Sequence, residues 1–198
     1  QEAFPQAVQT GAYGLTEAGG VIAFHHPEDS LEKRLNTCGK PMPGLLAKII
    51  DPETLEEQKR GEKGEIILKG YSVFDGYYKA PEKNQESFIE GWFRTGDLGV
   101  LDSDGYIEFH GRIKDMLKVG GENVAAIEIE SLLSTHPAVN IAQVIGVHDE
   151  RLFEVACAYI ELIDGKSMTE AEIIDFCKGK IASFKIPRHV RFVDEWPM

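Results

Sequence analysis

Short apolar runs alternate with turn-forming residues between Gly44 and Gly111. The runs lie at Leu45–Ile50, 65–68, 98–101 and 106–109. Each run has the length of a strand, and Asp-Pro, Gly-Glu-Lys-Gly and Asp-Ser-Asp-Gly sequences between them are typical of turns. The pattern therefore predicts a meander of antiparallel strands, interrupted by a short helix at 80–87 that has Pro81 near its start.

Ahead of the meander, residues 7–12 are predicted to form the end of a buried strand. A loop rich in Gly, Thr and Glu follows and continues to Gly20. A chain seldom begins in the middle of such a unit, and this one opens on Gln1 rather than on methionine. We therefore expect the sequence to be a piece of a longer protein.

The pattern changes after Arg112. Four apolar residues are predicted to mark one face of a helix that ends before His136-Pro137: Ile127, Ile129, Leu132 and Leu133. Two β-rich segments follow, at about 139–147 and 155–162. Thr169, with Glu172 three positions later, predicts the N-cap of a helix that runs to about residue 181. These elements form a compact α+β unit, and its boundary with the meander is expected within 111–115.

Composition and charge narrow the class of protein. The 198 residues are 42% apolar and 27% charged, as in ordinary globular proteins, and no apolar run approaches the ~18 residues of a membrane span. Subtracting 33 Asp and Glu from 21 Lys and Arg gives a net charge of −12, which disfavours nucleic-acid binding. Three widely spaced cysteines fit a reducing compartment, so we expect a cytoplasmic protein.

The segment Tyr13-Gly14-Leu15-Thr16-Glu17 carries the first candidate chemistry. An aromatic ring can stack on a base, a hydroxyl can bind a phosphate oxygen, and a carboxylate near phosphates usually needs Mg²⁺ between them. The alternative is a capped turn, in which Thr16 and Glu17 open a helix or loop.

Two later segments add further groups. Asp97 follows a Thr-Gly turn in Arg94-Thr95-Gly96-Asp97, where a carboxylate can accept hydrogen bonds from both hydroxyls of a ribose. The alternative is an ordinary Asx turn. The segment from Gly111 to Glu122 places three basic groups and three glycines at the expected boundary, and salt bridges on a solvated turn explain the charges but not the glycines.

Together these segments resemble the adenylate-forming, or AMP-binding, enzymes of the acyl-CoA synthetase type. Their order matches, with 80 positions from Glu17 to Asp97 and 15 from Asp97 to Arg112. Further segments are similar to family positions: Gly39-Lys40-Pro41, Gly64-Glu65-Ile66, Gly76-Tyr77-Tyr78, Gly91-Trp92-Phe93, Glu128-Ile129-Glu130 and Phe184-Lys185-Ile186-Pro187. The resemblance implies an α/β and α+β fold. Residues 1–112 would be the β-rich, distorted-barrel-like end of the large domain, and 113–198 the small α+β C-terminal domain.

The resemblance implies a ligase reaction with ATP, Mg²⁺ and CoA as co-substrate. A carboxylic acid, fatty or otherwise organic, would become an acyl-adenylate, and the CoA thiol would then capture the acyl group. Nucleotide-binding roles would go to Ala12, Tyr13, Gly14, Leu15, Thr16, Asp97 and Arg112. Tyr13 would stack on adenine, Thr16 would contact phosphate, and Asp97, supported by Arg112, would hold the ribose. Glu17 would bind the metal. The resemblance implies a catalytic role for both Thr16 and Glu17.

The resemblance also implies roles beyond the boundary. Lys114 would be the hinge about which the small domain rotates between the two half-reactions. Lys118 would be catalytic, or alternatively a surface lysine. Gly120 and Gly121 would line the path of the CoA pantetheine arm, because glycine admits close approach to the backbone.

The sequence departs from the family pattern at three places. Ala12 stands where glycine is common, a glycine-rich phosphate loop expected upstream of Tyr13 is missing, and the chain ends before the segment that carries the family's catalytic lysine. We therefore expect the chain by itself to be inactive. The acid cannot be assigned, since only Gly19, Gly20 and Val21 would reach the acyl pocket.

Other functions remain open. The chain could be a non-catalytic nucleotide-binding or interaction module, the adenylation domain of a carrier-protein-dependent synthetase, or a luciferase relative. Four histidines are expected in turns or on the surface: His25, His26, His110 and His148. The basic stretch 176–193 could meet CoA phosphates or form a solvated face, with Phe184, Ile186 and Pro187 serving in packing.

Overall fold

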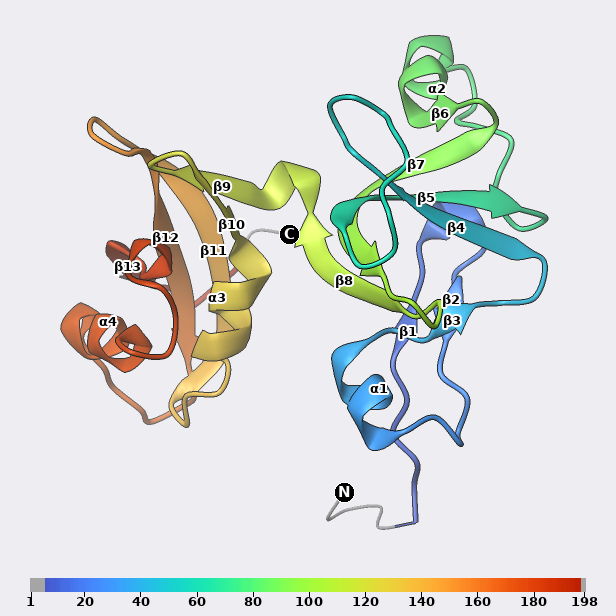
Figure 1. Cartoon of the computed structure of the whole chain (residues 1–198). Helices are drawn as coiled ribbons and strands as arrows, with labels where there is room; N and C mark the ends of the chain where they lie inside the picture. Colours follow the sequence, from blue (N-terminus) through green and yellow to red (C-terminus); the bar gives the residue numbers. More distant parts are fainter. Residues whose placement is uncertain (1–5, 197–198) are drawn as a thin grey trace. The chain divides into compact units, whose positions relative to one another are not determined.

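The computed structural model describes residues 6–196, and it divides into two compact units (Figure 1). The first unit comprises Gln1–Ile113 and the second Lys114–Met198. The division falls within the segment where the sequence pattern changes. In the described part of the chain, no helix is both long enough and apolar enough to cross a membrane.

The described residues of the first unit form two antiparallel sheets. The smaller sheet has the order β1-β2-β3, formed by Ala12–Tyr13, Ala23–Phe24 and Lys40–Pro41. The larger has the order β4-β5-β7-β6, and β8 also pairs with β7. Its strands are β4 (Leu45–Ile50), β5 (Lys63–Gly70), β6 (Phe88–Ile89), β7 (Trp92–Leu101) and β8 (Ile107–Arg112). This arrangement confirms the predicted meander, and α2 (Pro81–Ser87) confirms the predicted helix.

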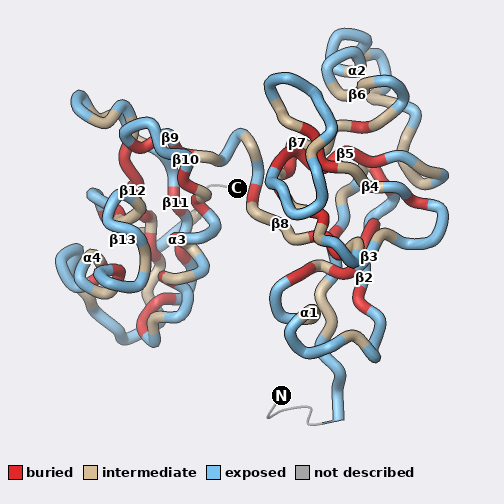
Figure 2. The backbone as a smooth tube through the Cα atoms, viewed as in Figure 1, coloured by how far each residue is buried: buried red, intermediate tan, exposed pale blue. Residues whose placement is uncertain are grey.

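The core of the first unit lies where the two sheets meet. Buried residues cluster there from both sheets, including Tyr13, Ala23, Ile49, Ile66 and Ile107. Residues 65–68 of β5 are all buried, because this strand lies between two neighbours in the sheet (Figure 2). The core therefore fixes Tyr13 beside the central strands.

The second unit packs two helices on a mixed sheet. Its sheet has the order β10-β9-β12-β11, with β13 parallel to β12. The strands are β9 (Met116–Val119), β10 (Glu122–Ala125), β11 (Val139–Asp149), β12 (Phe153–Leu162) and β13 (His189–Phe192). Helices α3 (Ala126–Leu133) and α4 (Glu170–Cys177) bury Ile129, Leu133, Ile173 and Cys177 in one cluster with the strands. The unit is the predicted α+β unit.

Several local predictions are wrong. Residues 7–9 are exposed and no strand precedes β1 in the described residues, because no neighbouring strand covers that apolar pattern. Ile127 is 41% exposed, because the buried face of α3 runs through Ala126, Ile129 and Leu133. Helix α4 ends at Cys177 rather than near 181, since Lys178 is extended, with ψ of 130°.

The histidine prediction is wrong for His25. Its side chain is fully buried, not at the surface. Its Nε2 lies 2.9 Å from the Thr37 Oγ1 and 3.1 Å from the Lys33 carbonyl oxygen, and the Gly11 N–H donates to its Nδ1. Hydrogen bonds to the backbone and to the Thr37 hydroxyl, which leave no spacing signature in the sequence, satisfy this ring inside the core.

The N-cap of α4 supports a stability prediction. Thr169 Oγ1 accepts from the Glu172 N–H, and the Glu172 carboxylate accepts from the Thr169 N–H at 2.8 Å, which confirms the predicted capping box. Replacing Thr169 by alanine removes the cap and is expected to lower the free energy of unfolding of the second unit by about 1 kcal/mol. Urea unfolding measures the change. Ser167→Ala, at an exposed position nearby, is the control, and equal losses in the two variants would contradict the prediction.

Candidate functional site

The loop after β1 is shaped by glycine. A short 3₁₀ turn, η1 (Thr16–Ala18), ends at Gly19, which has a φ of 77°. A Cβ on Gly14 would lie 1.5 Å from the Gly20 carbonyl oxygen, so no other residue fits at that position. In the loop Gly14 and Thr16 are exposed, as is Ala12 of β1, whereas Tyr13 is only 6% exposed.

Asp97 is a buried carboxylate at the centre of a hydrogen-bond cluster in the first unit. In the β7–β8 pairing it stands directly opposite Arg112, whose Nε donates to its Oδ1 at 3.1 Å. The Tyr13 hydroxyl donates to its Oδ2 at 2.7 Å. Residues 84 and 15 positions away along the chain thus converge on one carboxylate that is 4% exposed. Each carboxylate oxygen has two lone pairs, so each retains an acceptor position.

The environment keeps Tyr13 a hydrogen-bond donor. Burial, together with the bond to Asp97, raises the pKa of the phenol far above its usual value. The ring lies 5.9 Å from the Phe109 ring, centroid to centroid. Its hydroxyl is therefore committed to Asp97, and little of the ring surface is open for stacking.

The turn before Asp97 is held by hydrogen bonds to the carboxylate of Glu65, a residue to which the sequence analysis assigned no role. Glu65 is 1% exposed, and its Oε2 accepts from Arg94 Nη2 at 2.6 Å and from Arg94 Nε at 3.0 Å. Its Oε1 accepts from the Gly96 N–H at 3.1 Å. The position of Glu65 in the apolar run at 65–68 was the sequence signal that could have indicated this role, since a buried carboxylate requires hydrogen-bond or ion-pair partners.

Glu17 forms a second pair in the same unit. Its Oε1 accepts from the Tyr77 hydroxyl at 2.8 Å. Burial and the bond to Glu17 raise the pKa of Tyr77. The positive charge of Arg112 acts in the opposite direction and lowers the pKa of both Tyr13 and Tyr77. The first unit thus holds predicted site residues in β1, in the loop after it, and in β7 and β8.

The predicted residues beyond Arg112 belong to the second unit. Lys114 is exposed in a 3₁₀ turn, η2 (Ile113–Asp115). Gly120 and Gly121, with φ of 58° and 93°, form the two-residue turn between β9 and β10, for which such left-handed values are typical. The exposed Lys118 donates its backbone N–H to Glu154 Oε2 at 2.8 Å. A shallow hollow beside this turn is lined by Met116, Lys118, Gly121, Phe153 and Glu154.

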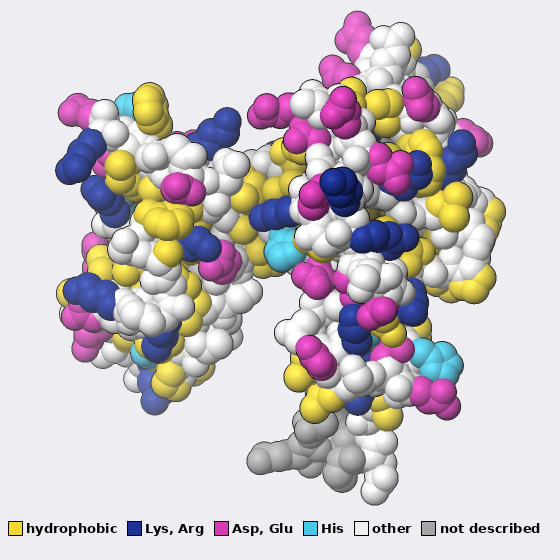
Figure 3. Space-filling model, viewed as in Figure 1, with side chains coloured by type: hydrophobic (Ala, Val, Ile, Leu, Met, Phe, Trp, Pro, Cys, Tyr) yellow, Lys and Arg dark blue, Asp and Glu magenta, His cyan; other side chains and the backbone are white. Residues whose placement is uncertain are grey.

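Charges of both signs are dispersed over the visible face of the molecule (Figure 3). Lys and Arg side chains alternate with Asp and Glu on the face that Figure 3 shows. In the basic stretch 176–193, Lys185 binds Glu128 at 2.7 Å and Arg191 lies 3.3 Å from Glu170. These ion pairs favour the solvated face. The packing prediction fits the buried Pro187 and fails for Phe184, which is 40% exposed.

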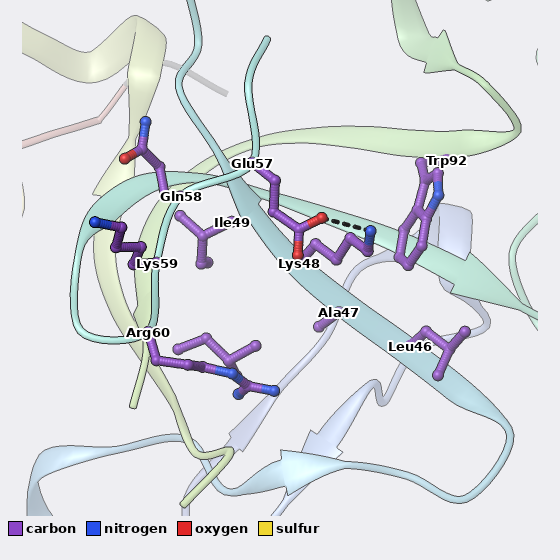
Figure 4. Close-up of a pocket in the computed structure, with 10 residues that line it drawn as sticks. Leu46, Ala47, Lys48, Ile49, Glu57, Gln58, Lys59, Arg60 and Trp92 are labelled. Carbon is purple, nitrogen blue, oxygen red and sulfur yellow. Dashed lines mark hydrogen bonds and ion pairs between the residues drawn. The ribbon is translucent and has the colours of Figure 1, made fainter. Parts of the chain in front are cut away.

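The first unit also contains a pocket that none of the predicted site residues lines (Figure 4). It is lined by Leu46, Ala47, Lys48, Ile49, Glu57, Gln58, Lys59, Arg60, Trp92 and Leu101. Lys48 binds Glu57 at 2.6 Å and lies 5.0 Å from the Trp92 ring centroid, so its charge is already paired. This pocket shares no residue with the cluster around Asp97.

Two family models match the chain. The model described as AMP-binding enzyme matches residues 1–78, and the model described as AMP-binding enzyme C-terminal domain matches residues 128–198. The chain is 47% identical over 190 residues to YngI of Bacillus subtilis, whose name assigns acyl-CoA synthetase activity provisionally. It is 43% identical over 187 residues to the mitochondrial medium-chain acyl-CoA ligase of Rattus norvegicus. These alignments cover 96% and 94% of the chain but 35% and 30% of the relatives, so the chain spans about a third of their length.

Solved structures give the same result. The o-succinylbenzoate-CoA synthetase of Bacillus subtilis, in complex with its acyl-adenylate intermediate, matches with a TM-score of 0.87 and 38% identity. The match covers 94% of this chain and 37% of that one. The same enzyme in complex with ATP and a magnesium ion matches with a TM-score of 0.86, 37% identity and coverage of 94% and 38%.

Proposed function

Because the chain belongs to the AMP-binding, adenylate-forming enzymes, we propose that it is part of an ATP-dependent acid:CoA ligase. In the first half-reaction a carboxylate oxygen attacks the α-phosphorus of ATP, giving an acyl-adenylate and pyrophosphate. In the second, the CoA thiol attacks the acyl carbon and AMP leaves. The convergence of Tyr13 and Arg112 on Asp97 is the observation that carries the proposal, because it builds a preorganised acceptor for a nucleotide sugar.

Asp97 is the proposed ribose ligand. Its two oxygens each keep an acceptor position, which suits two neighbouring hydroxyls. Tyr13 and Arg112 fix the orientation of the carboxylate before the nucleotide arrives, so binding costs little reorganisation. The exposed Ala12 and Gly14, with the half-buried Leu15, would line the base site.

Glu17 and Thr16 are the proposed groups for the phosphates. Mg²⁺ usually binds one or two protein carboxylates together with substrate phosphates and water, and a half-buried single carboxylate fits that set. Among residues 6–196, no group of three or more His, Cys, Asp and Glu side chains could hold a metal ion by itself. Bound there, the metal would neutralise charge on the phosphates. The exposed Thr16 hydroxyl would donate to a phosphate oxygen.

The second unit would act in the second half-reaction, in which the CoA thiol attacks the acyl-adenylate. We assign residues 1–112 to the large domain and 113–198 to the small domain, with Lys114 as the hinge between the two half-reactions. Lys118 would face the reacting groups, and Gly120 and Gly121 would leave room for the pantetheine arm. The open turn between β9 and β10 supports this assignment.

Product analysis tests the proposal. The complete protein that contains this chain is incubated with ATP, Mg²⁺ and a panel of carboxylic acids, with and without CoA, and products are identified by mass. Medium-chain fatty acids come first, since one relative is named as a medium-chain ligase. A CoA thioester and AMP are expected. An acyl-adenylate that CoA does not discharge would assign a carrier protein or another acceptor, and no product with any acid would favour a binding module.

A further inference from the structure

The Tyr77 hydroxyl makes a long-range contact that the nucleotide assignments above do not use. Tyr77 lies in the loop between β5 and α2, and it donates to Glu17 Oε1, 60 residues earlier in the chain, at 2.8 Å. The same loop also holds the backbone of Glu17, because the Phe74 N–H donates to the Glu17 carbonyl oxygen at 2.8 Å. Glu17 is thus anchored at its main chain and at one carboxylate oxygen.

Helix α2 fixes the position of Tyr77. The Asn84 Oδ1 accepts from the Tyr77 N–H at 2.7 Å, and the Asn84 Nδ2 donates to the Tyr77 carbonyl oxygen at 3.0 Å. Gly76, at φ 134°, allows this clamp, because a Cβ there would lie 3.0 Å from the Asn84 side chain. These two hydrogen bonds to the side-chain amide of Asn84 leave the Tyr77 backbone little freedom.

The ring of Tyr77 is held as well. It packs edge-on against Phe74, with centroids 4.8 Å apart and an interplanar angle of 79°. The Lys83 ammonium lies 3.6 Å from the Tyr77 ring centroid. Because the backbone and the ring are both fixed, the hydroxyl is aimed at Glu17 by the fold. A tyrosine phenol is protonated at neutral pH, so its hydroxyl is a hydrogen-bond donor to Glu17.

We propose that Tyr77 is a positioning residue that orients the Glu17 carboxylate for the metal of the bound nucleotide, an inference that rests on the proposed function. A carboxylate can bind a metal through one oxygen while the other accepts a hydrogen bond. Such outer hydrogen bonds hold ligands in place, and their loss typically weakens metal affinity about 10–100-fold. Tyr77 would act through Oε1 and leave Oε2 for the metal.

Calorimetric titration of the complete protein with Mg·ATP and, separately, with AMP in EDTA tests this role. Tyr77→Phe keeps the ring and removes the hydroxyl, so it is expected to weaken Mg·ATP binding about 10–100-fold. AMP binding, which needs no metal, should not change. The control is Tyr78→Phe, because Tyr78 is adjacent but 87% exposed, and it is expected to alter neither affinity.

A third variant separates this inference from the function on which it rests. Glu17→Gln should weaken Mg·ATP binding, and adding Tyr77→Phe to it should cause no further loss. If Glu17→Gln has no effect, the metal assignment of Glu17 fails. If Glu17→Gln weakens Mg·ATP binding but Tyr77→Phe behaves like Tyr78→Phe, only the role of Tyr77 fails. Equal losses for Mg·ATP and AMP in Tyr77→Phe would also overturn it, since they would indicate a general structural effect.

Discussion

Replacing Asp97 by alanine is expected to lower kcat/KM for ATP in adenylation by about 10²–10⁴-fold. A hydrogen bond to a charged group contributes roughly 1.5–3 kcal/mol, and the proposed ribose contact has two of them. The sum of about 3–6 kcal/mol converts to that range at about 1.4 kcal/mol per factor of ten. Pyrophosphate release at varied ATP concentration measures the change in the complete protein. Asp75→Ala, at an exposed carboxylate in the same unit, is the control.

The sugar of the nucleotide provides a sharper test. If Asp97 binds the ribose hydroxyls, the unaltered protein should discriminate against 2′-deoxy-ATP, and Asp97→Ala should lose that discrimination. The substitution also leaves the Tyr13 hydroxyl and the Arg112 guanidinium without this partner, so some loss of stability is expected. If Asp97→Ala instead lowers kcat/KM by the same factor for ATP and for 2′-deoxy-ATP, the discrimination persists and the loss is a general structural one. The ribose assignment would then be wrong.

The meander could be predicted because its signals are local. Strand-length apolar runs and turn residues alternate along β4, β5, β7 and β8, and each of these strands pairs with the next one of the four along the chain. The capping box of α4 was predictable for the same reason, since Thr169 and Glu172 lie three positions apart.

Other elements depend on contacts that local patterns do not encode. The strands β9 and β10 have only four residues each. The glycines of the turn between them were interpreted as lining the path of the pantetheine arm, not as the turn of a hairpin. Strand β13 forms by parallel pairing with β12. It lies within the basic stretch 176–193, which shows no strand pattern in the sequence. Helix α1 (Leu31–Asn36) is only six residues long and buries none of them, so its sequence is too short to show a clear apolar periodicity.

The candidate site divides in a similar way. Tyr13, Asp97 and Arg112 were selected from separate segments, and the fold brings them together around one carboxylate. Glu65 and Tyr77 received no role, because a carboxylate inside a strand or a tyrosine in a loop acquires its meaning only from a distant partner. For Tyr13 the sequence suggested a stacking role for the ring, and the structure adds a hydrogen bond from its hydroxyl to Asp97 that the sequence did not predict.

Lys114→Pro is expected to slow one half-reaction at least about 100-fold while the other is retained. Lys114 is the first residue of the second unit, exposed in the turn η2, and as the proposed hinge its backbone must adopt two conformations. Proline fixes φ near −65° and removes the N–H, at a cost of about 3 kcal/mol or more where another conformation is required. That cost corresponds to a factor of about 100 in rate.

Separate assays of the two half-reactions decide whether the hinge lies at Lys114. Pyrophosphate release reports adenylation, and thioester formation from a preformed acyl-adenylate and CoA reports the second step. Lys114→Ala removes the same side chain but leaves φ free, so it should retain both steps. If alanine and proline impair the same step equally, the side chain rather than the backbone matters. If proline leaves both rates unchanged, the conformational change occurs at another residue, because a hinge residue cannot tolerate a fixed φ in both orientations.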